Sequence, residues 1–448
     1  MRTGWADTER ADLPADPVAP FTRARRERLH AQFAGHRLLV PAGGDLRRSN
    51  DTDFRFRPHS NYTWLTGDQT SDGVLVISPD GSATLFLRPR SDRKDDEFYR
   101  DRRYGELWNG RRPTLLETAR RCDIPTRHIT ELEHELRSSA PTLVLRDVDP
   151  RVDRLVPADG SGADAEFAAA LDELRLIKDE WEIAQLEHAV AATTRGFEDV
   201  VRALPQARDT SERYLEGVFW TRARVEGNDV GYHSIVAAGA HATTLHWTSN
   251  DGPVRDGDLL LLDAGVETRT LYTADITRVL PISGRFTPLQ RDLYELCRRA
   301  NDVALSCLRP GAPFRAFHRA GMAVLAQGLE DLGVLPCTAA EALEEESGVY
   351  RRWTLCGSGH MLGLDVHDCA LAPADRYLDG VLEPGHVLTV EPGLYFQPDD
   401  ELIPVELRGM GFRIEEDILI TSDGHRVLSA DLPRTAADVE SWMHRTAA

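Results

Sequence analysis

The order of hydrophobic and polar residues changes character once along the 448-residue chain. Before about residue 147, short apolar runs such as 73–77 and 83–87 alternate with segments of helical spacing such as 114–122. Short strands mixed with helices are typical of an α/β domain. The segment 147–164 is rich in Asp, Pro, Gly and Ser, and we predict that it is a linker.

The residues after this linker predict longer helices. Apolar residues keep helical spacing throughout 167–204. A second helix is predicted from the Thr-Pro start signal at 287–288 to about residue 308, and a third over 313–332. The change of pattern therefore predicts two domains, 1–165 and 166–448.

Acidic residues stand at the ends of two predicted strands in the second domain. Asp263 ends the apolar run 258–263, and Glu391 ends the run 386–391. Carboxylates at strand ends are rigidly aimed, as a metal site requires. Asp275 follows Asp263 by twelve positions, which is consistent with a hairpin that brings the two aspartates together.

A further acidic phrase lies in 412–420, where polar and apolar residues alternate as in one β-strand. The alternation places Arg413, Glu415 and Asp417 on one face and turns Glu416 to the other. This pattern predicts that Glu415, and not Glu416, faces the site.

Each acidic residue alone has an ordinary structural explanation. Asp263 precedes Ala-Gly as in a turn, Asp275 can pair with Arg278 at the surface, and Glu415 can lie on an exposed strand face. Five residues nevertheless form one candidate set, namely Asp263, Asp275, His360, Glu391 and Glu415, whose phrases are weighed together below. Four carboxylates and one imidazole suit two divalent cations, because carboxylate oxygens can bridge two ions. We expect Mn²⁺, with Co²⁺ or Zn²⁺ as alternatives.

Composition narrows the class of protein. A net charge of −20 argues against nucleic acid or an anionic membrane as partner. The chain contains no apolar run near the ~20 residues that cross a bilayer and no secretory apolar stretch at its start. Its six cysteines lack paired spacing, which indicates reduced thiols. We therefore expect a cytoplasmic enzyme.

The phrases that contain these five residues resemble the metallopeptidase family of aminopeptidase P, prolidase and methionine aminopeptidase. They are Leu-Leu-Leu-Asp-Ala-Gly (260–265), Ala-Asp-Ile-Thr-Arg (274–278), Gly-His-Met-Leu-Gly-Leu-Asp-Val-His-Asp (359–368), Val-Glu-Pro-Gly (390–393) and Arg-Ile-Glu-Glu-Asp (413–417). Residues 54–58, 62–67 and 102–105 look like the N-terminal domain of aminopeptidase P, which methionine aminopeptidases lack, and 174–178 looks like the entry into the catalytic domain. The resemblance implies an α/β (α+β) protein in which a creatinase/prolidase-like N-terminal domain precedes a pita-bread metallopeptidase domain.

The resemblance also implies roles for residues around the ligands. In aminopeptidase P and prolidase, histidines matching His246 and His367 line the cleft, contact the scissile peptide and stabilise charge in the tetrahedral intermediate. Glu391 would act as general base and acid besides binding metal. Tyr232 and Arg413 would help to shape the substrate site.

The reaction implied is release of one N-terminal residue from a peptide whose second residue is proline. Such a bond lacks the amide hydrogen that general peptidases recognise, so the enzyme needs an apolar pocket for the ring and an acidic site for the α-amine. A carboxylate such as Asp263 can receive the ammonium, or the amine can bind one metal ion after it loses its proton. Prolidase, which cleaves only dipeptides, is the nearest alternative. Family members form dimers or tetramers, so we expect a homodimer or homotetramer in which Tyr99 or its neighbours border a partner's cleft.

Two positions depart from the family pattern. Cys356 stands where aminopeptidase P and prolidase have a histidine beside the metals, and a thiol is a weak donor without positive charge. His233 stands where related sequences often have a smaller or neutral residue. These substitutions leave open a tolerated small residue at Cys356 or a relative recruited to different chemistry in a specialised pathway. A non-catalytic peptide-binding protein would ordinarily have lost ligands.

Overall fold

The computed structural model describes residues 3–10, 12–344, 346–355 and 357–447. The chain forms two compact units, Met1–Leu174 and Arg175–Ala448. No helix in the described part of the chain is long and apolar enough to cross a membrane.

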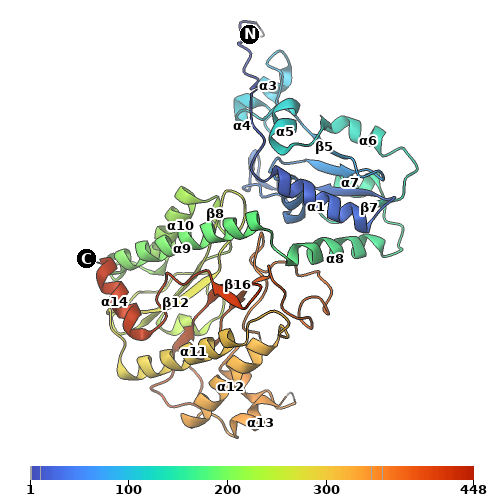
Figure 1. The fold of residues 1–448 in the computed structure, drawn as a ribbon. Coiled ribbons are helices and arrows are strands. Elements are labelled where there is room, and N and C mark those ends of the chain that lie inside the picture. Colours follow the sequence, from blue (N-terminus) through green and yellow to red (C-terminus); the bar gives the residue numbers. More distant parts are fainter. Residues whose placement is uncertain (1–2, 11, 345, 356, 448) are drawn as a thin grey trace. The chain divides into compact units, whose positions relative to one another are not determined.

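The first unit contains a five-stranded mixed sheet flanked by helices (Figure 1). In spatial order its strands are β6 (Thr126–His128), β5 (Ala83–Leu87), β4 (Val74–Ile77), β1 (Arg37–Pro41) and β7 (Thr142–Val144). The small hairpin β2 (Arg47–Ser49) and β3 (Thr52–Asp53) lies outside it. The helices are α1 (Ala19–Gln32), α2 (Ser60–Thr66), α3 (Asp96–Arg100), α4 (Glu106–Asn109), α5 (Leu115–Cys122), α6 (Leu132–Glu135), preceded by the short turn η1 (Ile129–Glu131), α7 (Pro150–Leu155) and α8 (Ala163–Leu176). The predicted strands 73–77 and 83–87 are confirmed as β4 and β5.

Helix α5 begins where the sequence predicts, because Thr114 and Glu117 cap its first turn reciprocally. The predicted linker 147–164 contains helix α7 and the first residues of α8, and its Val152 packs in the core of the first unit, so the segment belongs to that unit.

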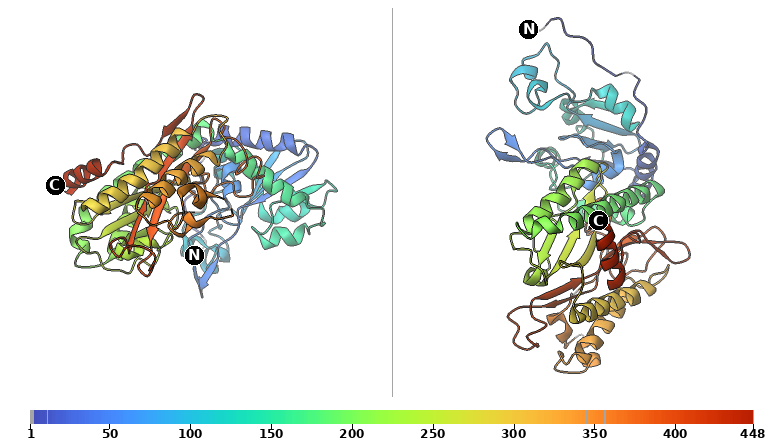
Figure 2. Two further views of the ribbon diagram at one scale, coloured as in Figure 1. Left: turned by 90° about the horizontal axis from the view of Figure 1, so that it is seen from below. Right: turned by 90° about the vertical axis from the view of Figure 1, so that its left-hand side faces the viewer.

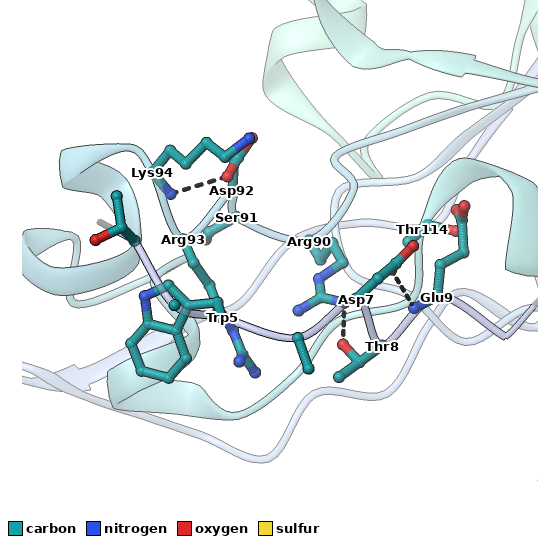
Figure 3. A pocket seen from close by; sticks show the side chains of 13 residues that line it. Trp5, Asp7, Thr8, Glu9, Arg90, Ser91, Asp92, Arg93, Lys94 and Thr114 are labelled. Atoms are coloured by element: carbon teal, nitrogen blue, oxygen red, sulfur yellow. Dashed lines mark hydrogen bonds between the residues drawn. The ribbon is translucent and has the colours of Figure 1, made fainter. Parts of the chain in front are cut away.

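A cavity of 760 Å³ lies where the first described residues run along the loop that follows β5 (Figure 3). Arg90 donates a 2.8 Å hydrogen bond to the Thr8 hydroxyl, which ties the segment to this loop. The guanidinium of Arg93 lies over the ring of Trp5, with its central carbon 4.7 Å from the ring centroid, as in a cation–π contact. None of the predicted ligands or cleft residues lines this cavity.

The second unit holds two small sheets with helices outside them. Its helices are α9 (Glu180–Ala207), α10 (Glu212–Glu226), α11 (Pro288–Ser306), α12 (Ala316–Asp331), α13 (Ala339–Leu343) and α14 (Ala436–Ala447), and its short helical turns are η2 (Gly239–Thr243) and η3 (Val349–Arg352). Its strands are β8 (Asp229–Val230), β9 (Ile235–Ala238), β10 (Leu259–Ala264), β11 (Val266–Glu267), β12 (Ile276–Pro281), β13 (Val387–Val390), β14 (Gly393–Phe396), β15 (Met410–Arg413), β16 (Glu416–Ile420) and β17 (His425–Val427). The sheets are β12-β10-β9 and β13-β16-β17, with the pairs β14-β15 and β8-β11 beside them. Figures 1 and 2 show α9 and α10 on one side of the strands and α11 and α12 on the other.

The helices predicted at 287–308 and 313–332 are confirmed as α11 and α12. The continuous helical pattern over 167–204 is broken, because α8 ends at Leu176 and α9 begins at Glu180. Asp179 and Glu182 form a capping box that starts a new helix, with hydrogen bonds of 3.0 and 3.1 Å. Local capping therefore overrides the apolar periodicity there.

The prediction of one strand over 412–420 is wrong. Strand β15 pairs with β14, whereas β16 pairs with β13, so the chain changes partners between them. At this change the backbone N–H of Glu415 donates to the carbonyl of Thr277 at 3.2 Å. Glu415 is thereby fixed against β12.

Candidate metal centre

The first two predicted ligands lie on the antiparallel pair β10 and β12. Asp263 is opposite Thr277, and Asp275 immediately precedes β12, so the predicted hairpin is confirmed. Both aspartates are buried. The surface pairing of Asp275 with Arg278 is excluded, because Arg278 donates instead to Glu416 at 2.7 Å.

Three predicted ligands offer atoms within 4.8 Å of one another, namely Asp275, His360 and Glu415. Glu391, which directly follows β13, joins them through its Oε1, 3.5 Å from His360 Nε2. The same imidazole nitrogen lies 3.4 Å from Asp275 Oδ2. Segments far apart in the sequence thus converge on one point.

The orientation of His360 is set by its own backbone surroundings. Its Nδ1 lies 3.1 Å from the carbonyl of Met361, an acceptor, so Nδ1 carries the proton and Nε2 faces the carboxylates. The Thr389 hydroxyl accepts from the His360 N–H at 3.2 Å and donates to Glu391 at 3.4 Å. Sequence reasoning missed Thr389, although it stands two residues before Glu391.

Crowded negative charge dominates the electrostatics of this site. Burial, together with Asp275 and Asp263, raises the pKa of Glu391 to about 7. Burial and the charges of Asp275 and Glu391 raise the pKa of Glu415 well above its usual range. Burial would lower the pKa of His360, but Asp275 and Glu391 outweigh it and raise the pKa to about 9. The carboxylates therefore repel one another and favour added positive charge.

Asp263 is held at the side of this cluster by Tyr232 and Arg413. The Tyr232 hydroxyl donates to Asp263 Oδ1 at 2.7 Å, and Arg413 forms an ion pair with Oδ2. Burial raises the pKa of Asp263, an effect that Arg413 opposes and Asp275 reinforces. The structure thus places Tyr232 and Arg413 on a predicted ligand.

Arg413 is itself fixed by residues that the sequence did not single out. It donates to the Thr277 hydroxyl at 3.0 Å and to the Tyr395 hydroxyl at 2.9 Å. Thr277 in turn donates to Glu415 Oε2 at 2.6 Å. A hydrogen-bonded chain therefore joins Asp263 to Glu415 on the far side of the cluster.

Asp417 is a further buried carboxylate next to the cluster. Its Oδ2 accepts the N–H of Asp275 at 3.1 Å. Burial and the charge of Asp275 raise its pKa well above the usual range. The sequence pointed to Asp417 only through the alternation in 412–420, which placed it on the same face as Glu415.

The two predicted cleft histidines lie beside this cluster and are open to solvent, although the ring of His367 is partly covered. The ring of His367 meets that of His360 edge-on, with centroids 4.3 Å apart. Burial and the positive charge of His360 lower the pKa of His367, and His246 lies close enough to lower it further. His233 is also exposed, beside Tyr232. Cys356 lies outside the described residues.

The donor set fits divalent metal ions. Carboxylate oxygens and one imidazole nitrogen converge in a buried space, and their mutual repulsion is what bound cations relieve. The part of the second unit that holds these residues can therefore support metal-assisted hydrolysis.

Comparison with known proteins gives the same picture over nearly the whole chain. Residues 184–422 match Metallopeptidase family M24, and residues 22–143 match the aminopeptidase P N-terminal domain. The chain is 54% identical to Xaa-Pro aminopeptidase 1 of Streptomyces coelicolor, over 99% of this chain and 91% of that protein. It is 30% identical to the Xaa-Pro aminopeptidase of Escherichia coli, over 94% and 97%.

Solved structures agree in fold. The zinc-substituted aminopeptidase P of E. coli in complex with product has a TM-score of 0.85 at 29% identity, over 96% of this chain and 99% of that one. An aminopeptidase of Pseudomonas aeruginosa has a TM-score of 0.83 at 29% identity, over 97% and 99%. The predicted fold class, an α/β N-terminal domain followed by a pita-bread domain, is confirmed. The chain belongs to metallopeptidase family M24 and is a metal-dependent hydrolase of its aminopeptidase P branch.

Proposed function

We propose that this enzyme removes the N-terminal residue from peptides whose second residue is proline. The observation that supports this most directly is the buried carboxylate cluster with His360, in a chain that resembles Xaa-Pro aminopeptidases from end to end. The resemblance covers both the domain of 1–165 and the catalytic domain of 166–448 that we propose. It therefore favours an aminopeptidase over a prolidase or over recruitment to other chemistry.

We propose Asp263, Asp275, His360, Glu391 and Glu415 as ligands of two divalent ions, with Mn²⁺ as first choice and Co²⁺ or Zn²⁺ as alternatives. Such ions, when bound, supply a hydroxide at neutral pH and polarise the scissile carbonyl. Tyr232 and Arg413 hold Asp263 in place through the contacts described above. Asp263 also offers negative charge to the α-ammonium of the substrate.

The proton chemistry falls to Glu391. Its carboxylate directly follows β13 and lies 3.5 Å from His360 Nε2, inside the cluster, where it can accept a proton from water and pass it on. We assign to it the transfer of a proton from the attacking water to the leaving proline nitrogen.

His367 and His246 face the place where the scissile peptide would lie. Partial burial of its ring lowers the pKa of His367, which favours the neutral imidazole. A neutral imidazole can donate one N–H to the oxygen that becomes negative during attack. We propose this role for His367 and substrate contact for His246.

The proposal also covers the oligomeric state, the partners and the compartment of the enzyme. We infer a homodimer or homotetramer, as the resemblance implies, and no nucleic-acid partner, because the chain carries a net charge of −20. The six cysteines lack the paired spacing of a disulfide framework, which favours a reducing, cytoplasmic compartment.

Product analysis by mass spectrometry tests the reaction. The purified, Mn²⁺-loaded enzyme is offered Xaa-Pro dipeptides, longer Xaa-Pro-Xaa peptides and matched Xaa-Ala peptides. Release of only the first residue from the longer proline peptides is the expected result. Cleavage of dipeptides alone would identify a prolidase instead, and equal cleavage of the alanine peptides would refute proline specificity. Cys356→His, assayed in parallel, shows whether the thiol has altered the substrate range.

A further inference from the structure

A buried carboxylate on α10 forms several hydrogen bonds to the loop that carries His246. Glu212, the first residue of α10, is fully buried, and its side chain faces the segment 238–252 rather than solvent. Its Oε1 accepts the N–H of Ala238 at 2.7 Å, and its Oε2 accepts the N–H of Gly252 at 2.8 Å. One side chain therefore bonds both ends of the loop.

The same carboxylate bonds two side chains inside the loop. Oε1 lies 2.9 Å from His241 Nδ1, and Oε2 accepts the indole N–H of Trp247 at 2.9 Å. An ionised carboxylate can only accept hydrogen bonds, so His241 carries a proton on Nδ1. The rings of His241 and Trp247 stack with centroids 3.8 Å apart and an interplanar angle of 23°. All four acceptor positions of Glu212 are thus used on this loop.

The close approach of the loop to Glu212 depends on Gly252. A Cβ at this position would lie 2.4 Å from a ring carbon of His241 and 3.0 Å from Glu212 Oε1. The backbone N–H of Glu212 also donates to the Gly252 carbonyl at 2.9 Å. Only glycine fits between the two side chains.

His246 directly precedes Trp247 and is exposed, so the position of its ring depends on the backbone that Trp247 anchors. Its backbone carbonyl accepts the N–H of Thr248 at 3.0 Å, a bond within the loop itself. At the base of the loop, Asn250 bonds the Ser234 carbonyl and the Val236 N–H, each at 2.9 Å. Glu212 bonds both the ends of the loop and Trp247, the residue next to His246.

We propose that Glu212 is a positioning residue, which holds His246 against the substrate by fixing the loop 238–252. This inference rests on the proposed function, in which His246 contacts the scissile peptide. Glu212 itself touches neither the ligands nor the cleft histidines, and acts through Trp247 and the loop backbone.

Glu212→Gln tests this role with little change of shape. The amide replaces one acceptor oxygen by a donor, so two of the four N–H groups then face another donor. We expect kcat on an Xaa-Pro-Xaa peptide to fall about 10- to 100-fold, because His246 is then displaced from the reacting bond. The amount of bound metal should stay unchanged. Glu216→Gln removes the same charge one turn along α10, at a half-buried position, and serves as the matched control.

A double-mutant cycle separates positioning from a general loss of structure. If Glu212 acts through His246, Glu212→Gln causes no further loss in a His246→Ala background. Equal loss in both backgrounds would overturn the inference. Trp247→Phe keeps a smaller aromatic ring and removes one hydrogen bond to Glu212, so it serves in the same cycle if Glu212→Gln does not fold.

Hydrogen exchange of the whole enzyme decides the anchoring independently of activity. Amides of 238–252 should exchange about 10-fold or more faster in Glu212→Gln than in the wild type, because two buried donors lose their acceptor. Unchanged exchange would overturn the inference. A wild type inert on every proline peptide would instead refute the proposed function, whereas an active wild type with additive variants would refute the positioning role alone.

Discussion

Two groups of buried charges in the second unit are built on opposite principles. In the described part of the candidate metal centre, the positive charges that act on Asp263, Glu391 and Glu415 come from Arg413 and His360. In a second group, Asp368 is paired with both Arg175 and Lys178, whose Nζ lies 2.8 Å from Asp368 Oδ2. The first group, called the unbalanced group below, has excess negative charge. In the second, called the balanced group, each carboxylate oxygen of Asp368 is paired with a cation.

The pKa values move in opposite directions as a result. Burial raises the pKa of Glu391 to about 7, since its acidic neighbours reinforce it. Burial also acts on Asp368, but Arg175 and Lys178 outweigh it and lower the pKa to about 2. The balanced group requires no added cation, and it stabilises the loop of His367, the residue before Asp368. The unbalanced group gains stability only when cations bind, which distinguishes a functional site from a structural ion pair.

The largest effect is expected from removal of one charge from the unbalanced group. Asp275→Asn should lower kcat/KM on an Xaa-Pro-Xaa peptide on the order of 1,000-fold or more, because the lost carboxylate weakens metal binding and misplaces the hydroxide. Bound metal is measured on the same samples by elemental analysis. Asp292→Asn, an exposed aspartate on α11, is the control. Full activity with full metal in Asp275→Asn would contradict the ligand assignment.

Removal of one charge from the balanced group should act on stability instead. Lys178→Met leaves Asp368 with only one of its two cations in a buried place, and we expect a loss of about 3 to 5 kcal/mol in the free energy of unfolding. Urea denaturation measures this loss, with the exposed Lys94→Met as control. Metal content at saturation should stay at the wild-type level. A variant as stable as the wild type would show that the ion pair contributes nothing.

Metal removal should distinguish the same two groups. At a free Mn²⁺ concentration 100 times the dissociation constant, binding adds about 2.7 kcal/mol to the folded state. A chelator should therefore lower the melting temperature of the wild type and of Lys178→Met by similar amounts. Asp275→Asn should show little shift at the same Mn²⁺ concentration. Equal shifts in all three proteins would place the stabilising metal elsewhere.

The sequence predicts the parts of this comparison that depend on local pattern. The twelve-residue spacing predicts the β10–β12 hairpin with Asp263 and Asp275, and Thr287 predicts the start of α11. It does not predict the change of strand partner at Glu415, because that depends on the contact of its N–H with Thr277, far away in the chain.

The residues around the ligands were missed for the same reason. Thr389, Tyr395 and Asp417 are ordinary strand or strand-end residues until the fold brings them to His360, Arg413 and Asp275. Glu212 likewise begins an ordinary helix, and its hydrogen bonds to the loop 238–252 give it a role. A motif identifies groups that perform chemistry, whereas the groups that hold them are identified by long-range contacts.

The smallest effect is the dependence of the balanced group on pH. The pKa of Asp368 is lowered to about 2 in the folded protein, compared with about 3.9 for an unfolded aspartate. A depressed pKa means that the charged form stabilises the fold above about pH 4 and that this contribution is lost as the pH falls towards 2. The wild type should therefore melt higher than Asp368→Asn by a constant margin between pH 5 and pH 7, at fixed metal, and the margin should shrink below about pH 4. Thermal melts of both proteins across this range measure it. A margin that persists at pH 2 would mean that Asp368 acts through its shape and hydrogen bonds, and that charge balance is not what separates this group from the metal centre.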